Sequence, residues 1–171
     1  MQINVAQLLK GPIGATQDYQ VDGTVDVVGG GSDATVRGGV RLMHTQRGIL
    51  VKGELRAEVE LTCSRCLSLY NCPVRLSFEE EYIPIMDIVS GAPLAPPGEP
   101  GSFIVDEHNV IDLSEAIRQY ALLAVPMKPL CREDCAGLCP RCGHNLNQGP
   151  CGCPQEVNDA RWSELSKLRN K

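Results

Sequence analysis

The sequence predicts an α+β fold: an antiparallel β-sheet or partly open barrel, a packed helix, and a cysteine-rich, zinc-binding C-terminal segment. Three observations lead to this prediction. Apolar and polar residues alternate along several segments before residue 83, an apolar stripe with helical spacing follows residue 112, and six of the nine cysteines lie between Cys131 and Cys153. A period of two is typical of half-buried strands, and a period near 3.6 is typical of amphipathic helices.

The clearest strand covers residues 49–61, where the odd positions are apolar or Gly and the even positions are polar except for Leu50. Alternation on both sides of this segment predicts further strands, and Gln46-Arg47-Gly48 predicts a tight turn that makes a hairpin. The additional strands are expected at residues 19–28, 36–42 and 74–82. Residues 1–83 are therefore expected to form a meander-like sheet or a partly open barrel.

A loop rich in Pro and Gly is expected at about residues 86–101, because this composition suits neither a helix nor a regular ladder of hydrogen bonds. A helix should follow at about 112–125, with Asp112 as its cap, Glu115 three residues later, and Pro126 at its end. We expect this helix to pack on the sheet through an apolar stripe: Leu113, Ala116, Ile117, Tyr120 and Ala124.

A second, weaker helix is predicted at about residues 159–168, with Trp162 on its apolar face. The expected organisation is a β-rich domain over residues 1–130, which includes the loop and the first helix. A cysteine-rich zinc segment with the C-terminal helix would then occupy residues 131–171.

The composition limits the possible functions. The formal net charge is −5 and the sequence pI is about 5.2, which excludes a uniformly basic nucleic-acid-binding protein. No stretch approaches the ~18 apolar residues of a membrane helix, and the N-terminus has no basic leader before a long apolar run. We therefore expect a cytoplasmic protein without a membrane partner. In that reducing compartment, clustered cysteines indicate metal or redox chemistry in place of disulfides.

The cysteines form four close pairs, which are enough ligands for two complete tetrahedral zinc sites. The Gly- and Asn-containing connection can fold back locally, so we assign one site to Cys139, Cys142, Cys151 and Cys153. By elimination, the other site consists of Cys63, Cys66, Cys131 and Cys135, and Cys72 remains a strand residue. A swapped pairing stays open at this stage, and so does a ligand role for His144.

Both predicted zinc sites have only sulfur ligands and are closed, as structural sites are, whereas catalytic zinc usually keeps one coordination position open. The sequence also has no P-loop, nucleotide-binding Gly motif or nucleophile elbow. We therefore expect a binding or assembly factor that is not an enzyme and has no small-molecule substrate.

The segment from Pro129 to Asn147, Pro-Leu-Cys-Arg-Glu-Asp-Cys-Ala-Gly-Leu-Cys-Pro-Arg-Cys-Gly-His-Asn-Leu-Asn, resembles the YceD family, as does Cys63-Ser-Arg-Cys-Leu67. The resemblance extends to the helix at 112–126 and to Asp159-Ala-Arg-Trp162. This family is described as large ribosomal RNA subunit accumulation proteins. The resemblance implies a non-enzymatic role in producing or stabilising that RNA, through contact with its precursor or with a ribosomal or assembly protein.

Binding to RNA requires clustered Lys and Arg. Residues 37–56 contain five bases and one acid, Glu54, and the candidate RNA-binding residues among them are Arg37, Arg41, Lys52 and Arg56. Arg65 and Arg141, inside the two Cys-x-x-Cys turns, are further candidates.

Two hairpin registers are possible for these bases. A turn centred on Arg47-Gly48, which the glycine favours, places Arg41 and Arg37 opposite glutamates in ordinary ion pairs. A turn centred on Gln46-Arg47 places them opposite Lys52 and Arg56, which destabilises the hairpin unless a partner uses the charges.

Two other functions remain open from the sequence. The acidic stretch Glu79-Glu80-Glu81 could bind a basic protein, which would make the chain a zinc-stabilised protein-interaction module. A thiol redox sensor is also possible and would need exposed cysteines with low pKa values.

Overall fold

The computed structural model describes residues 1–27, 33–94 and 101–154. Its elements, in chain order, are β1 (Gln2–Asn4), α1 (Ala6–Lys10), β2 (Thr16–Asp26), β3 (Asp33–His44), β4 (Ile49–Thr62), β5 (Leu69–Pro84), β6 (Ile104–Val105), β7 (Val110–Asp112), α2 (Ser114–Ala124) and the 3-10 turn Leu146–Gln148. The predicted C-terminal helix at 159–168 and residues 95–100 of the predicted loop lie outside the described residues.

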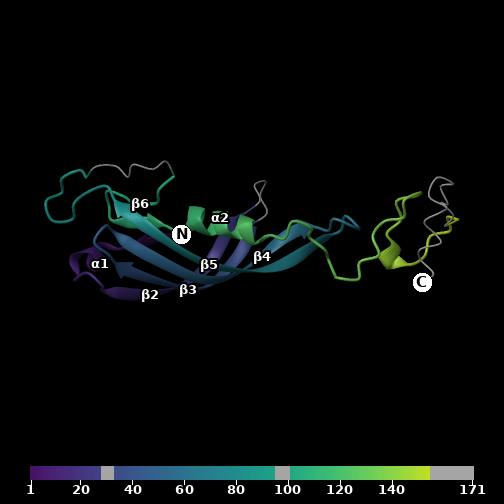
Figure 1. The fold of residues 1–171 in the computed structure, drawn as a ribbon, viewed down its shortest axis with the longest axis horizontal. Helices are drawn as coiled ribbons and strands as arrows, with labels where there is room; N and C mark the ends of the chain where they lie inside the picture. Colours follow the sequence, from purple (N-terminus) through teal and green to yellow (C-terminus); the bar gives the residue numbers. More distant parts are fainter. Residues whose placement is uncertain (28–32, 95–100, 155–171) are drawn as a thin grey trace, which may run out of the picture.

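A curved, five-stranded sheet forms a half-barrel, with α2 lying along it (Figure 1). Strands β2 to β5 form an antiparallel meander, and the short β6 joins β5 in parallel, which makes the sheet mixed. Strands β1 and β7 pair separately. The predicted α+β class with a partly open barrel is confirmed, except that the sheet is not wholly antiparallel.

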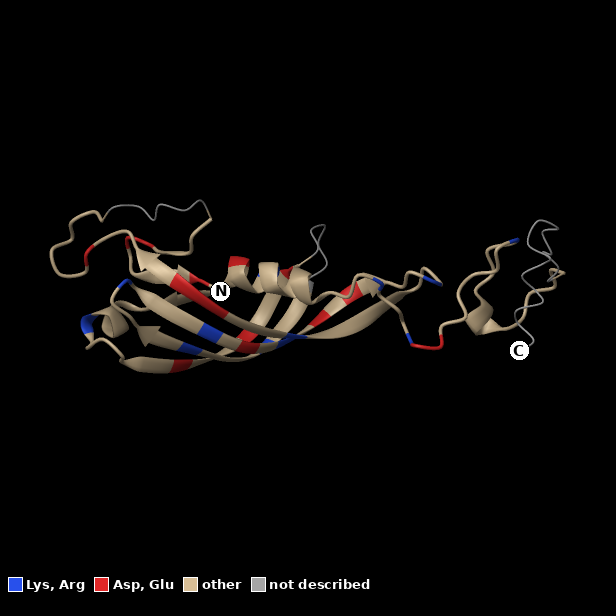
Figure 2. Cartoon of the chain, in the orientation of Figure 1, with Lys and Arg blue, Asp and Glu red and all other residues tan. Residues whose placement is uncertain are grey.

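The alternating residues of β4 separate the two faces of the sheet. Its odd positions from Ile49 to Leu61 are buried, whereas most of the even positions are exposed. The buried face packs against α2, where the rings of Phe78 and Tyr120 lie 5.3 Å apart between centroids. The opposite, convex face of the sheet carries most of the charged residues of β2 to β5. Glu80 is an exception, because it lies on the side of α2 and accepts a hydrogen bond from Tyr120. Basic and acidic segments are interspersed along these strands (Figure 2).

Helix α2 is close to its predicted position, but its first turn differs from the expected capping box. The carboxylate of Asp112 accepts a hydrogen bond from the amide of Ser114 at 2.8 Å. Glu115 binds the side chains of Arg118 and Gln119 instead of turning back toward Asp112. The N-cap of the helix is Leu113, whose side chain makes no capping hydrogen bond, so the prediction of Asp112 as the cap is wrong by one residue.

The β3–β4 hairpin has the register that places like charges opposite each other. Arg41 lies opposite Lys52, and Arg37 lies opposite Arg56. The register that we expected from Gly48, in which both arginines would face glutamates, is wrong.

The turn explains this register. The hydroxyl of Thr45 accepts hydrogen bonds from the amides of Arg47 and Gly48, and the amide of Thr45 donates to the Gly48 carbonyl. These bonds hold a four-residue turn that ends the ladder at His44. A Cβ on Gly48 would collide with the carbonyl oxygen of Tyr82 on β5. Glycine is therefore needed at this position because the turn packs closely against β5. The sequence pattern does not reveal this contact.

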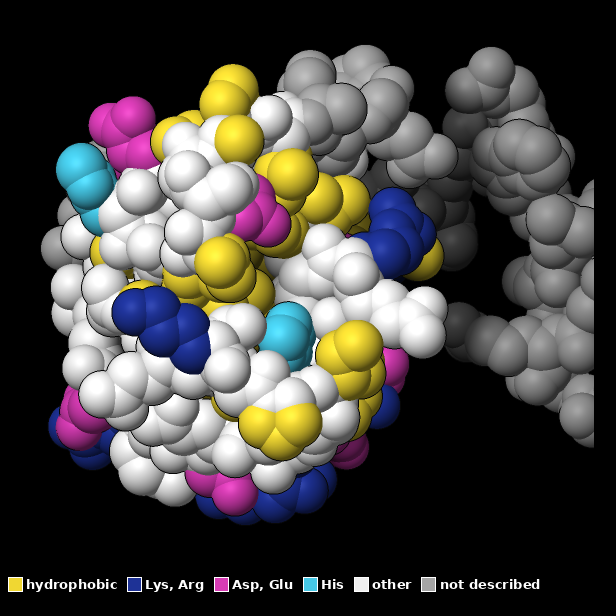
Figure 3. Space-filling view, turned by 90° about the vertical axis from the view of Figure 1, so that its left-hand side faces the viewer, with side chains coloured by type: hydrophobic (Ala, Val, Ile, Leu, Met, Phe, Trp, Pro, Cys, Tyr) yellow, Lys and Arg dark blue, Asp and Glu magenta, His cyan; other side chains and the backbone are white. Residues whose placement is uncertain are grey.

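Apolar side chains gather on the surface among charged ones at the end of the half-barrel where α1 lies (Figure 3). Ile13, which follows α1, has 63% of its surface exposed. Among the described residues, no helix has both the length and the apolar character that crossing a membrane requires.

The close approach at Gly48 predicts that Gly48→Ala destabilises the fold by about 1–3 kcal/mol, because a methyl group overpacks the contact with β5. Gly39→Ala is the matched control, since its added Cβ would meet only the Gln20 side chain at 3.8 Å. Urea unfolding of the two variants measures the difference. Equal midpoints for both variants and the unmodified chain would contradict the account of this turn.

Candidate metal centres

Eight of the nine cysteines lie in two groups of four, and within each group the sulfur atoms are all within 4.8 Å of one another. The first group, here the hairpin centre, contains Cys63, Cys66, Cys131 and Cys135; the second, the tail centre, contains Cys139, Cys142, Cys151 and Cys153. The structure thus brings together the sets assigned from spacing and not a swapped pairing.

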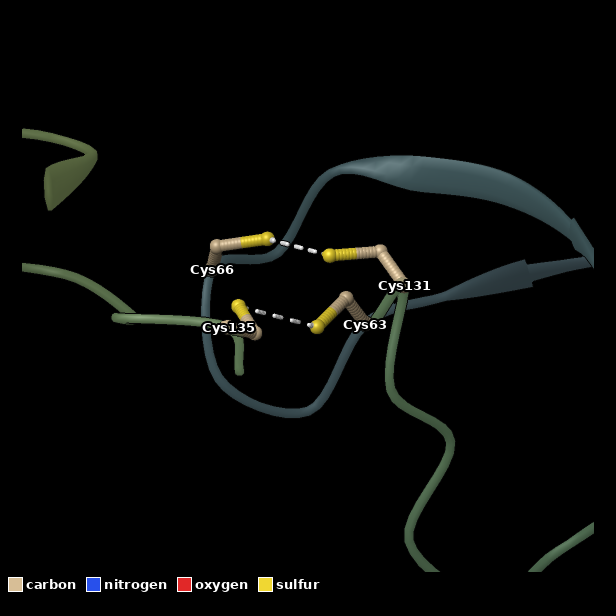
Figure 4. A group of neighbouring side chains, drawn as sticks. All are labelled: Cys63, Cys66, Cys131 and Cys135. Carbon is tan, nitrogen blue, oxygen red and sulfur yellow. Dashed lines mark hydrogen bonds between the residues drawn. The ribbon is translucent and has the colours of Figure 1, made fainter. Parts of the chain in front are cut away.

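The hairpin centre joins two parts of the chain that are distant in sequence. Cys63 and Cys66 lie in the turn between β4 and β5, whereas Cys131 and Cys135 follow α2. Figure 4 shows the four side chains pointing toward one another, with sulfur distances of 3.8 Å for Cys63 to Cys135 and 3.6 Å for Cys66 to Cys131.

These sulfur distances fit a metal site better than disulfides. Tetrahedral zinc with bonds of ~2.3 Å places its sulfur ligands about 3.8 Å apart, whereas a disulfide needs about 2.05 Å. Each group supplies four thiol ligands, which is a complete set for a closed tetrahedral site. Both groups therefore could hold a metal ion.

The two Cys-x-x-Cys turns share one backbone pattern. Cys63 and Cys139 each accept a hydrogen bond at their carbonyl from the residue four positions later, and their amides donate to the residue five positions later. The residues after the second cysteines, Leu67 and Gly143, have φ values of 58° and 72°. Glycine adopts this left-handed conformation without steric cost, whereas leucine does not. The shared geometry directs two sulfurs toward one point in each centre.

The ionisation of the thiols differs within each centre. Backbone amides, first that of Cys66, lower the pKa of Cys63 to about 6, and those of Cys142 and Arg141 lower the pKa of Cys139 to about 6. Burial, followed by hydrogen bonding with Cys66, raises the pKa of Cys131 to about 12.

The pKa of Cys153 in the tail centre is likewise raised to about 12, chiefly by its hydrogen bond with Cys142. Neighbouring cysteines thus oppose the ionisation of one thiol in each group, Cys131 in the hairpin centre and Cys153 in the tail centre. A bound divalent cation would remove this opposition and deprotonate all four thiols.

Two polar side chains support the hairpin centre. The guanidinium of Arg65 donates to the carbonyl of Cys135 at 3.0 Å. The amide nitrogen of Asn147 donates to the sulfur of Cys135 at 3.3 Å, while its oxygen accepts from the Ala136 amide and from Arg132. Asn147 lies between Cys142 and Cys151, so it connects the tail segment to the hairpin centre. The spacing of the cysteines in the sequence predicts the metal ligands, but it does not predict the supporting side-chain amide of Asn147.

Cys72 and His144 remain outside both groups. Cys72 is half-buried on β5 opposite Val59, as expected for a strand residue. The backbone carbonyl of His144 accepts from the Cys139 amide, but its exposed ring is not part of the tail centre.

The predicted RNA-binding residues differ in their surroundings. Arg41 and Lys52 form ion pairs with Asp18 and Glu79, at 2.7 and 2.9 Å. Arg37 pairs with the exposed carboxylate of Asp22 at 3.2 Å. Arg65 supports the hairpin centre, and Arg141 lies exposed in the second Cys-x-x-Cys turn.

Arg56 and a further base, Arg75, have no ion-pair partner within the described part of the chain. They lie opposite each other on β4 and β5. Sequence reasoning missed Arg75, although its place between the apolar residues Val74 and Leu76 predicts an exposed side chain.

The acidic stretch of β5 makes contacts within the chain. Glu79 pairs with Lys52, Glu80 accepts a hydrogen bond from the Tyr120 hydroxyl at 2.7 Å, and Glu81 accepts one from Thr45 at 2.8 Å. These contacts use part of the charge that a basic partner would need.

Separate centres predict separate losses of metal. Cys66→Ser and Cys142→Ser should each lower the metal content from about two ions to about one per chain, because each removes one ligand of a four-thiol set. Cys72→Ser is the control and should retain both ions. Metal analysis of protein purified without chelators measures the content, and an equal loss in all three variants would contradict the assignment.

Asn147→Ala should weaken metal binding at the hairpin centre ~10–100-fold, as loss of a hydrogen bond to a ligand typically does. Competition with a chromophoric chelator measures the affinity. Asn71→Ala, at an exposed position on β5, is the control. An affinity that is unchanged in Asn147→Ala would show that this amide has no role in holding the metal.

Comparisons with known proteins agree with the sequence resemblance. The model of the family described as "Large ribosomal RNA subunit accumulation protein YceD" matches residues 51–169, a range that includes all eight clustered cysteines. No solved structure matches the chain.

Curated relatives occur in bacteria and in a plant. An uncharacterized protein of Mycobacterium tuberculosis is 34% identical over 129 residues, which are 75% of this chain and 59% of the relative. One from Mycobacterium leprae is 27% identical over 75% of this chain and 57% of the relative. The chain thus spans less than two thirds of these relatives.

The plant relative is the "Large ribosomal RNA subunit accumulation protein YCED homolog 1, chloroplastic" of Arabidopsis thaliana. It is 36% identical over 61 residues, which are 36% of this chain and 19% of the relative. Because the family model covers well over half of the chain and includes both cysteine groups, this protein belongs to the YceD family.

Proposed function

We propose that this protein is a non-enzymatic ribosome biogenesis factor that supports the accumulation or processing of large-subunit ribosomal RNA. The family description and the name of the Arabidopsis relative support this role. The protein would act in the cytoplasm by binding the RNA precursor or an assembly partner.

Two structural zinc ions would stabilise the protein. Four thiolates in tetrahedral geometry suit zinc, and the sulfur distances of 3.6 and 3.8 Å in the hairpin centre support this choice. An all-sulfur set fills the coordination shell and leaves no position for a substrate. This chemistry supports a structural role for the metal and a binding function for the protein.

One observation favours RNA over a basic protein as the direct partner. Arg56 and Arg75 are exposed on the convex face of the sheet without ion-pair partners among the described residues, whereas Glu79, Glu80 and Glu81 make contacts within the chain. Available positive charge is what phosphate groups require. A thiol sensor fits less well, because the two cysteines whose pKa is lowered to about 6, Cys63 and Cys139, are buried, whereas reactive cysteines are accessible. The exposed Cys142 belongs to the four thiols of the tail centre.

Depletion of this protein from its cell should lower the amount of large-subunit ribosomal RNA relative to small-subunit ribosomal RNA. The unmodified gene should restore the ratio, and the variant Cys66→Ser, which loses the hairpin centre, should restore it poorly. Cys72→Ser is the control and should act as the unmodified gene does. Quantification of both RNAs measures the ratio, and a ratio that is unchanged on depletion would refute the proposed function.

A further inference from the structure

Three arginines form a row across the convex face of the sheet. Arg37 on β3 lies directly opposite Arg56 on β4, and Arg56 lies directly opposite Arg75 on β5. All three are exposed, and neighbouring strands place such positions about 5 Å apart. We call these residues the arginine row.

The arginine row is unfavourable for the isolated sheet, because like charges directly opposite each other repel. Asp22 continues the row on β2 but contacts only Arg37, and their side chains are 68% and 71% exposed. Such exposed ion pairs contribute little. No ion pair compensates Arg56 or Arg75 within the part of the chain that the structure describes.

A second row of charged residues on the same face, separated from the arginine row by the row of Glu54, provides a direct comparison. It consists of Asp18, Arg41, Lys52 and Glu79 on the same four strands. Here each base has its own acid, at 2.7 Å for Arg41 and 2.9 Å for Lys52. This second row is neutral as a whole, so repulsion is not a general property of the face but is concentrated in the arginine row.

The surface beside the arginine row is hollowed. Arg37, Arg56, Thr35, Gly38, Pro73, Ala57 and Glu58 line this depression. Gly38 and Pro73 have no long side chain that would fill it. The guanidinium groups at its border offer several N–H donors in the geometry that suits phosphate oxygens, whereas the Glu58 carboxylate in its lining opposes an anion inside the hollow itself.

Two carboxylates of β4 flank the arginine row, one on each side. Glu54 accepts a hydrogen bond from Ser77 at 2.9 Å, and Glu58 lies in the lining of the hollow. Both would repel an anion placed beside the row. A polyanion is therefore favoured only along the line that crosses β3, β4 and β5.

We propose that the arginine row is a binding site for the phosphate backbone of RNA, with Arg56 and Arg75 as its principal contacts. The choice of RNA as the polyanion rests on the proposed function, and the position of the site rests on the strand register. The candidate RNA-binding residues of the sequence analysis thus divide: Arg37 and Arg56 belong to the site with Arg75, whereas Asp18 and Glu79 neutralise Arg41 and Lys52.

The test compares two double variants that remove the same charge from the same face. Arg56→Gln/Arg75→Gln alters the arginine row, and Arg41→Gln/Lys52→Gln alters the neutral row. The probe is large-subunit ribosomal RNA precursor transcribed in vitro and labelled for fluorescence anisotropy. Titrations at several salt concentrations give the dissociation constant and its salt dependence.

Arg56→Gln/Arg75→Gln should weaken RNA binding tenfold or more and should lower the slope of log Kd against log salt by about 1.4, as loss of two phosphate contacts requires. The same variant should unfold at an equal or higher urea concentration than the unmodified chain, because it relieves repulsion. If the two arginines had a merely structural role, their replacement would lower the stability of the protein instead. Arg41→Gln/Lys52→Gln should bind RNA within threefold of the unmodified chain.

Equal RNA binding by Arg56→Gln/Arg75→Gln and the unmodified chain would overturn this site while leaving RNA contact elsewhere on the protein. An equal loss of RNA affinity in both double variants would overturn it as well, because the overall positive charge of the face, and not the arginine row, would then explain binding. Failure of the unmodified chain to bind the RNA would also overturn it. The role in RNA accumulation would survive that last result if depletion still lowered large-subunit RNA, and a protein would then be the partner.

Discussion

The arrangement of the cysteine-rich segment depends on four sulfur atoms that meet between the tip of the β4–β5 hairpin and the chain after α2. Cys63 and Cys66 come from the sheet side of this contact, and Cys131 and Cys135 come from the segment. Other links at the junction are single hydrogen bonds, such as those from Ser64 to Pro129 and from Asn145 to Ser68. Four clustered thiols become a strong junction only when a cation compensates their charge.

The junction also explains how the two cysteine groups differ. The tail centre closes a short local ribbon, whereas the hairpin centre joins residues more than sixty positions apart in the sequence. Closing a long loop removes more conformational freedom from the unfolded chain than closing a short one. The hairpin centre therefore constrains the architecture of the protein, and the tail centre constrains a segment that is already anchored beside it through Asn147.

The parts of the fold that depend on repeated local patterns could be predicted from the sequence. The alternation of β4 and the apolar stripe of α2 give the right elements, because burial of one face dominates their stability. The cysteine spacing likewise gives both groups. Strands β1, β6 and β7 could not be found, because two or three residues contain too few repeats to show a period.

The charged surface was harder to predict, because it depends on register. Gly48 suggested one turn, but the Thr45 hydroxyl and the packing of Gly48 on Tyr82 impose another. In the observed register, Arg37 and Arg41 therefore lie opposite other basic residues and not opposite the glutamates that we expected. Arg75 joins them only through the pairing of β4 with β5, which places it opposite Arg56. No local pattern in the sequence contains this information.

X-ray absorption spectroscopy at the zinc edge, on protein purified without chelators, tests the central claim most directly. The two closed centres predict four sulfur ligands at about 2.3 Å for each ion and two ions per chain. Nitrogen or oxygen ligands in the first coordination shell, or less than one zinc per chain, would contradict the account of a sheet and a tail joined by a four-thiolate metal centre.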